Sequence, residues 1–235
     1  MSINRVYYLI AACLLAMLSS CIMMGPQADP IALLQGKNDA MITAGLCAPG
    51  VSNTILGASV SGAYAPTDHF ALQVHAEFPF GKQRYQYPFY TSLNMGYFTN
   101  LGSNVIIENF YGGGYGNIST YSDPEIFCFG YGNVVRAYTQ INCGRINLGR
   151  VHGEFGGGLK LGYVGYHSSF KANLSGEIQY TNRWTHGMLI EPTLFYRFGW
   201  EHWRIGLQIT GSFSPMFPHG LVLGCDPSIT LNYCF

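Results

Sequence analysis

The sequence predicts an all-β protein: a closed antiparallel up-and-down transmembrane β-barrel of about ten strands, preceded by a cleaved helical signal peptide. Three observations predict this fold. Apolar and polar residues alternate with a period of two along most of the chain. The ionisable residues within these segments fall on the polar phase. Only 10% of the residues are charged, against about 25% in soluble domains. Barrels of about eight or twelve strands fit the same pattern and stay as alternatives.

The first segment, residues 1–20, has the pattern of an export signal. Arg5 precedes an apolar run from Val6 to Met17, which has the length of a signal-peptide core and is short for a membrane span. The run leads into Leu-Ser-Ser-Cys, which ends at Cys21. These four residues resemble the bacterial lipobox. The resemblance implies a lipoprotein signal peptide, cleavage before Cys21 and acylation of this cysteine with fatty acids such as palmitate. The alternative is an ordinary signal peptide or a helical anchor with a chance cysteine.

The second segment, residues 21–38, is predicted to be a lipidated tether. Pro26 and Pro30 block regular structure within it. The third segment, residues 39–235, is predicted to form the barrel.

The barrel segment contains ten stretches of alternating hydrophobicity. The clearest examples are His69–Phe80 and Trp203–Phe213. Most are longer than the five or six residues common in soluble strands, and they fit tilted membrane strands of about 9–11 residues or slightly more. The candidate strands are 39–47, 55–65, 69–80, 87–99, 104–115, 133–142, 153–166, 188–198, 202–213 and 227–235.

Charged residues mark the inner face of the predicted barrel. A Lys or Arg that faces lipid at mid-bilayer costs about 2–4 kcal/mol, whereas a soluble barrel carries its charges outside. We therefore expect the polar phase to line the lumen. Unpaired charges would be costly there, so we expect a network of ion pairs that closes the lumen. A narrow water-filled lumen is the alternative. The residues expected in this network are His75, Glu77, Glu108, Arg136, Glu154, Lys160, Glu191, Arg197 and Arg204.

The connections between the strands alternate in length. The links 65–69, 100–104 and 199–202 are short and rich in turn-forming residues. The links 116–132, 167–187 and 214–226 are long and are expected to be outer loops, because barrels have short periplasmic turns and longer external loops. The link 143–152 is longer than this rule predicts for its side.

The last strand carries a second family signal. Ile229, Leu231, Tyr233 and Phe235 share one face, and an aromatic residue ends the chain. This pattern resembles the C-terminal strand that the outer-membrane assembly machinery recognises. With the lipobox, it makes the chain similar to the small outer-membrane β-barrel proteins of Gram-negative bacteria. The resemblance implies a bacterial outer-membrane location, with outer-membrane lipids and the assembly machinery as partners. We expect the N-terminal lipid anchor on the periplasmic side.

The cysteines show no CxxC pair and no metal-ligand spacing. Cys47 and Cys225 lie near the outer ends of the first and last strands, which meet when the barrel closes. A disulfide between them is geometrically possible, and free thiols are the alternative.

The sequence offers no complete catalytic or cofactor motif. Gly112–Gly114 and Gly156–Gly158 lie in predicted strands without the Gly-Lys-Ser/Thr of a phosphate loop. His75 and Glu77 share a face and have the chemistry of a base and an acid, but we find no matched nucleophile and favour a lumen-lining role. Neither a metal nor a cofactor is expected. The zero net charge argues against a nucleic-acid partner.

These features favour an outer-membrane lipoprotein with a structural or surface-interaction role, which is not expected to be an enzyme. Two alternatives remain open. One is a lipid-modifying or proteolytic enzyme embedded in the outer membrane. The other is a lipid-anchored periplasmic β-barrel that binds an apolar ligand.

Overall fold

The computed structural model describes residues 29–47, 56–80, 89–102, 104–121, 129–146, 152–174, 177–217 and 220–235. The predicted signal peptide, Cys21 and the first part of the tether lie outside these ranges. The described chain forms ten strands. They are β1 (Ala40–Cys47), β2 (Leu56–Tyr64), β3 (Phe70–Phe80), β4 (Phe89–Asn100), β5 (Val105–Tyr121), β6 (Phe129–Arg145), β7 (His152–Leu174), β8 (Glu177–Gly199), β9 (Trp203–Phe217) and β10 (Gly220–Cys234).

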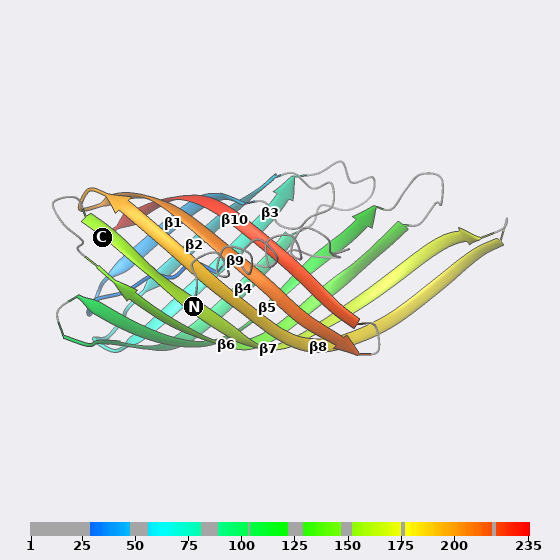
Figure 1. Ribbon diagram of the computed structural model, residues 1–235, viewed down its shortest axis with the longest axis horizontal. Helices are drawn as coiled ribbons and strands as arrows, with labels where there is room; N and C mark the ends of the chain where they lie inside the picture. The colour runs from blue at the N-terminus through cyan, green and yellow to red at the C-terminus, as the bar shows by residue number, and fades with distance from the viewer. Residues whose placement is uncertain are drawn as a thin grey trace, which may run out of the picture.

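The ten strands close into one antiparallel barrel, so the predicted fold is confirmed. Each strand pairs with its neighbours in sequence, and β1 pairs with β10. In this closing pair Met41 lies opposite Cys234, and Cys47 lies opposite Ser228. Figure 1 shows the strands tilted around a common axis. Closure leaves no strand with a free edge along the barrel wall.

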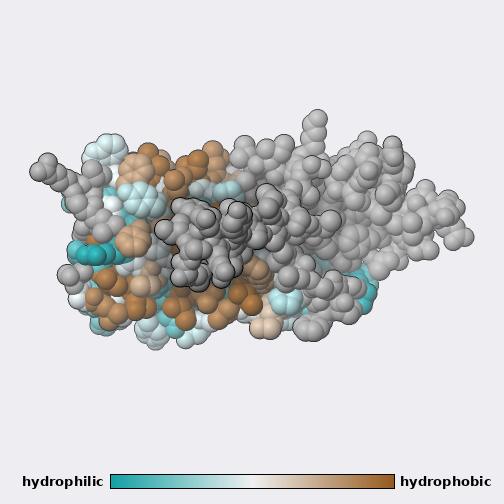
Figure 2. All heavy atoms as spheres, in the orientation of Figure 1, coloured by the Kyte–Doolittle hydropathy of each residue, from teal (hydrophilic) through white to brown (hydrophobic). Residues whose placement is uncertain are grey.

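The two faces of the wall differ sharply in chemistry. On β4, Ser92 and Asn94 point inward and are buried, while Leu93 and Met95 point outward and are exposed. The same alternation continues around the barrel, because successive side chains of a strand point to opposite faces. On the face in view in Figure 2, apolar residues gather over the described part of the barrel wall. The outer face of the barrel wall is therefore apolar, and its inner face is polar.

One end of the barrel is closed by short turns, and we call it the short-turn end. It is formed by residues 65–69, 101, 102, 104 and 200–202, and the C-terminus also lies there. Gly102 and Asn104 adopt positive φ angles of 64° and 74°, which glycine and asparagine tolerate best.

The opposite end carries long hairpins, and here the predicted strand limits are wrong. Instead of long loops over 116–132, 167–187 and 214–226, the structure continues the strands into these ranges. The longest hairpin is β7–β8, with 23 residues in each strand, and it projects well beyond the barrel in Figure 1. The physical reason is that backbone pairing persists after the apolar alternation ends. A hairpin that projects from the barrel needs hydrogen bonds but no lipid-facing side.

No helix in the described ranges is long and apolar enough to cross a membrane.

Candidate functional site

The barrel interior is filled by side chains of the wall and by an N-terminal segment that enters it. Residues 29–34, which belong to the predicted lipidated tether over 21–38, are all buried. Pro30 lies in this segment, which has no regular secondary structure. Its backbone groups are therefore satisfied by the wall. Glu108 Oε1 accepts a bond from the Leu34 amide at 3.0 Å, and Gln73 Nε2 donates to the Pro30 carbonyl oxygen.

Apolar side chains of residues 31–34 pack into two different clusters of buried wall residues near the short-turn end. Ile31 and Leu33 join a buried cluster with Ile106, Ile146 and Phe195. Ala32 and Leu34 join another buried cluster, which includes Phe98 and Phe110. These contacts bury apolar surface that a periplasmic tether would expose to water, which stabilises the inserted position of the segment.

The segment then turns into β1 over residues 35–39. The Lys37 amide donates to Asp68 Oδ1 at 3.1 Å, and the Asn38 amide donates to the Ala65 carbonyl at 2.7 Å. Both acceptors belong to the short turn between β2 and β3. The entry of the segment is thus fixed to the short-turn end of the barrel.

A central ion-pair network lies where this segment reaches deepest. Lys160 Nζ is 2.8 Å from Asp29 Oδ2 and 3.3 Å from Glu191 Oε2. Arg136 Nη1 donates to Glu191 Oε1 at 3.1 Å, and Ser212 Oγ lies 3.2 Å from the same oxygen. All five side chains are buried. The network joins β6, β7, β8 and β9 to the N-terminal segment across the lumen.

A second cluster lies nearer the short-turn end. Glu154 pairs with Arg197, whose Nε is 2.9 Å from Glu154 Oε2, and with Arg204. Arg197 also donates to the Ala32 carbonyl oxygen at 3.4 Å. Glu108 accepts from Asn142 Nδ2 at 3.0 Å in addition to the Leu34 amide. These charges therefore hold the N-terminal segment as well as one another.

The third group, His75 and Glu77, lies on β3 beside a small cavity. His75 Nε2 is 3.7 Å from Glu77 Oε2, and both side chains are buried. Cys47 and Asp226 line the same cavity from β1 and β10, and Pro30 forms part of its wall. Within the described ranges, no group of three or more His, Cys, Asp or Glu side chains is placed to hold a metal ion.

The structure thus places all nine predicted network residues in the interior and groups them in these clusters. Sequence reasoning missed two buried carboxylates, Asp29 and Asp226. Asp29 lies in a segment without strand periodicity, so no alternation pattern marks it. Asp226 shares the inward phase of Ser228 and Asn232, but the predicted strand began one residue after it. Among the described residues, the interior holds six carboxylates and four Lys or Arg side chains besides His75.

The possible Cys47–Cys225 disulfide is not formed in the structure, which has both cysteines as free thiols, the alternative given above. Cys47 pairs in register with Ser228, three positions beyond Cys225. Cys47 faces the lumen, whereas Cys225 lies on the opposite phase of β10 from the buried Asp226 and Ser228. A disulfide needs side chains that point toward each other, and these lie on opposite faces of the wall.

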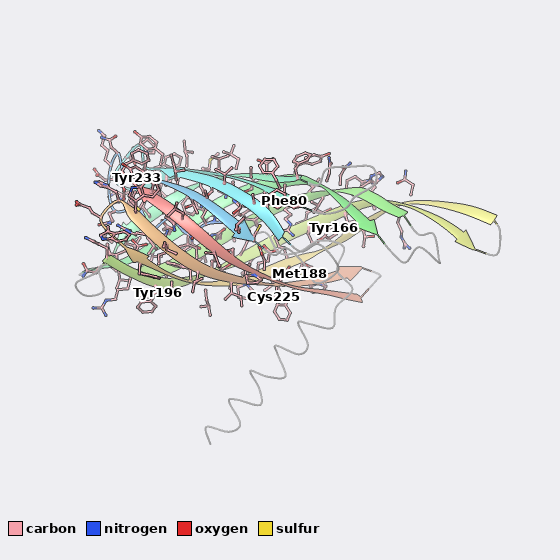
Figure 3. The ribbon with its side chains drawn as sticks, turned by 90° about the horizontal axis from the view of Figure 1, so that it is seen from above. Phe80, Tyr166, Met188, Tyr196, Cys225 and Tyr233 are labelled. Carbon is pink, nitrogen blue, oxygen red and sulfur yellow. The ribbon has the colours of Figure 1, made fainter. Side chains whose placement is uncertain are left out.

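The predicted assembly signal lies on the outer face of β10 and at Phe235, the residue that follows it. Ile229 and Phe235 are 59% and 63% exposed, and Leu231 is exposed beside them. Tyr233 packs edge-on against Trp203 and Phe235, with ring centroids 4.8 and 4.7 Å apart. Figure 3 shows Tyr196 and Tyr233 on the wall toward the short-turn end. Aromatic rings at one rim of an apolar band are typical of an interfacial girdle.

No family model matches the sequence, and no curated protein matches it. Among solved structures, the chain is similar to the N-terminal β-barrel domain of OprF from Pseudomonas aeruginosa. The identity is 11% over 85% of this chain and 100% of that chain, with a TM-score of 0.38. A likeness at this level carries no functional argument. The closed ten-strand barrel follows from the strand pairing itself.

Proposed function

We propose that this chain is a bacterial outer-membrane β-barrel lipoprotein with a closed lumen and a structural or surface-interaction role. One observation carries the proposal: the wall is apolar outside and charged inside. On β8, Leu194 is 65% exposed while Glu191, on the inner phase, is fully buried. In water, an apolar band of this kind would be an aggregation hazard. In a bilayer it is the lipid-facing surface that a transmembrane barrel requires.

The charged interior argues against an apolar ligand inside the barrel. An apolar molecule in the lumen would separate the side chains of Asp29, Lys160 and Glu191. Buried charges would then lose their partners. The loss of one partner from a buried ion pair costs about 3–5 kcal/mol. The lipid-anchored binder of apolar ligands therefore has less support than the inserted barrel.

The long hairpins support a surface role. With the lumen filled, the projecting strands are the described part of the chain that offers a surface to partners beyond the lipid-facing wall. On the β7–β8 hairpin, the rings of His167, Trp184 and His186 lie side by side, with centroids 5.0 and 6.0 Å apart. Exposed aromatic side chains are frequent anchors in protein interfaces.

The lipidation of Cys21 is part of the same proposal and is supported by the lipobox resemblance alone. The anchor on the periplasmic side stays a prediction. We also infer that the assembly machinery recognises the outer face of β10, and the exposure of its apolar residues supports this.

One experiment tests these parts separately. Cells that express the wild type or the Cys21→Ser variant are grown with labelled palmitate, and their membranes are extracted with alkaline carbonate. We expect label on the wild type alone. The wild type should resist extraction and migrate faster on gels before boiling than after it.

Each readout can fail by itself. Absence of label from the wild type would contradict lipidation but leave the barrel intact. Release by carbonate from the labelled protein would contradict insertion. Steady large openings of the purified protein in planar bilayers would contradict the closed lumen.

A further inference from the structure

The carboxylate of Asp29 is surrounded by donors that all come from the barrel wall. Ser92 Oγ donates to Oδ1 at 2.7 Å, and Tyr138 donates its hydroxyl to Oδ2 at 2.6 Å. Lys160 Nζ lies 2.8 Å from the same Oδ2. The three donors stand on β4, β6 and β7, and each is buried. Charge-assisted bonds of this length are the strong class of hydrogen bond.

A buried cation of the wall stands beside the Asp29 carboxylate. Lys160 Nζ lies 2.8 Å from Asp29 Oδ2 and 3.3 Å from Glu191 Oε2. The Lys160 ammonium lies 4.6 Å from the centroid of the Tyr138 ring, so the ring adds to its fixed position. A buried ammonium is stabilised by an anion that lies in hydrogen-bond contact with it.

The peptide that carries this carboxylate is held by other groups. Gln73 binds the Pro30 carbonyl, and Glu108 binds the Leu34 amide. Ser92, Tyr138 and Lys160 instead contact the Asp29 carboxylate. The side chains that bind the carboxylate are therefore different from those that bind the backbone at Pro30 and Leu34.

We propose that the barrel contains a binding site for small carboxylate anions, and that Asp29 fills it as an internal ligand. A soluble carboxylate of the size of formate or acetate binds to Lys160, Tyr138 and Ser92 when the Asp29 side chain is absent or withdrawn. This proposal goes beyond the envelope role and does not depend on lipidation, because it concerns the folded barrel alone.

The test uses the full chain with the Asp29→Ala substitution, folded into detergent micelles in sodium formate or in sodium chloride of equal ionic strength. The site predicts that formate raises the thermal unfolding midpoint of the variant by about 3 °C or more, with saturation, since a ligand stabilises the state that binds it. The wild type should show no difference between the salts, because its own carboxylate occupies the site.

Two control variants isolate the site. Asp68→Ala removes an exposed carboxylate at the short-turn end, and formate should have no specific effect on it. Asp29→Ala combined with Lys160→Met removes the cation, and the response to formate should disappear. The yield of folded Asp29→Ala protein is measured in both salts in case folding is impaired. Equal yields and equal midpoints in the two salts, including no folding in either, would overturn the proposal.

Discussion

Replacement of Glu191 by alanine is expected to lower the free energy of unfolding by about 3–5 kcal/mol, because it removes one partner from a buried ion pair. Arg136 would lose the carboxylate that lies 3.1 Å from its Nη1, and Lys160 would lose the carboxylate that lies 3.3 Å from its Nζ. The charge of Arg136 would then remain in the lumen without this compensation. Urea titration, read from the fraction of protein that keeps the fast-migrating form on unboiled gels, measures the change.

Glu201 provides the matched control for this substitution. It is an exposed glutamate in the short turn between β8 and β9, so Glu201→Ala should stay within about 0.5 kcal/mol of the wild type. If Glu191→Ala were as stable as Glu201→Ala, the central network would not hold the barrel together.

The second large effect is expected on the outer wall. Leu207 lies on the apolar face of β9 and is 53% exposed. An arginine there would face the hydrocarbon core, so Leu207→Arg should destabilise the barrel in lipid vesicles by about 2–4 kcal/mol. Folding into vesicles over a series of urea concentrations measures this loss.

Leu101→Arg is the corresponding control, because Leu101 is similarly exposed, at 54%, but lies in a short turn rather than on the lipid-facing wall. It should fold into vesicles as the wild type does. A wall that faces water would instead accept both arginines equally, and this result would argue for a soluble barrel.

The barrel could be predicted from the sequence because a bilayer and a polar lumen impose opposite demands on alternate residues. The prediction over 69–80 matches β3 at Phe70–Phe80, where Val74 faces out and His75 faces in. The same rule places Glu108 and Lys160 inside, since either would be costly in lipid.

The candidate site could be predicted only in part. The alternation of apolar and polar residues identifies the inward side chains of strands, but it gives no information on a segment such as residues 29–34, which is not a strand. Asp29 contacts Lys160 more than a hundred positions later, and only the closed barrel brings the two together. Local pattern also fails in the β7–β8 hairpin. Residues such as His167 and Trp184 pair in register there although the apolar alternation has ended.

The cysteines show a third limit. Sequence reasoning placed Cys47 and Cys225 near each other at the junction of the first and last strands. It could not fix the register of that junction, in which Cys47 meets Ser228. Because side chains alternate between faces, an offset of three positions places the two thiols on opposite sides of the wall.

The lipid-facing outer wall is tested most directly by a spin-label scan of residues 203–210 on β9, in a cysteine-free background and in lipid vesicles. Collision rates with oxygen, which enters the bilayer, and with a water-soluble nickel complex report what each label touches. We predict that labels at 203, 205, 207 and 209 collide with oxygen and not with nickel, and that labels at 204, 206, 208 and 210 collide little with either. Free access of nickel to the odd positions would contradict the membrane barrel.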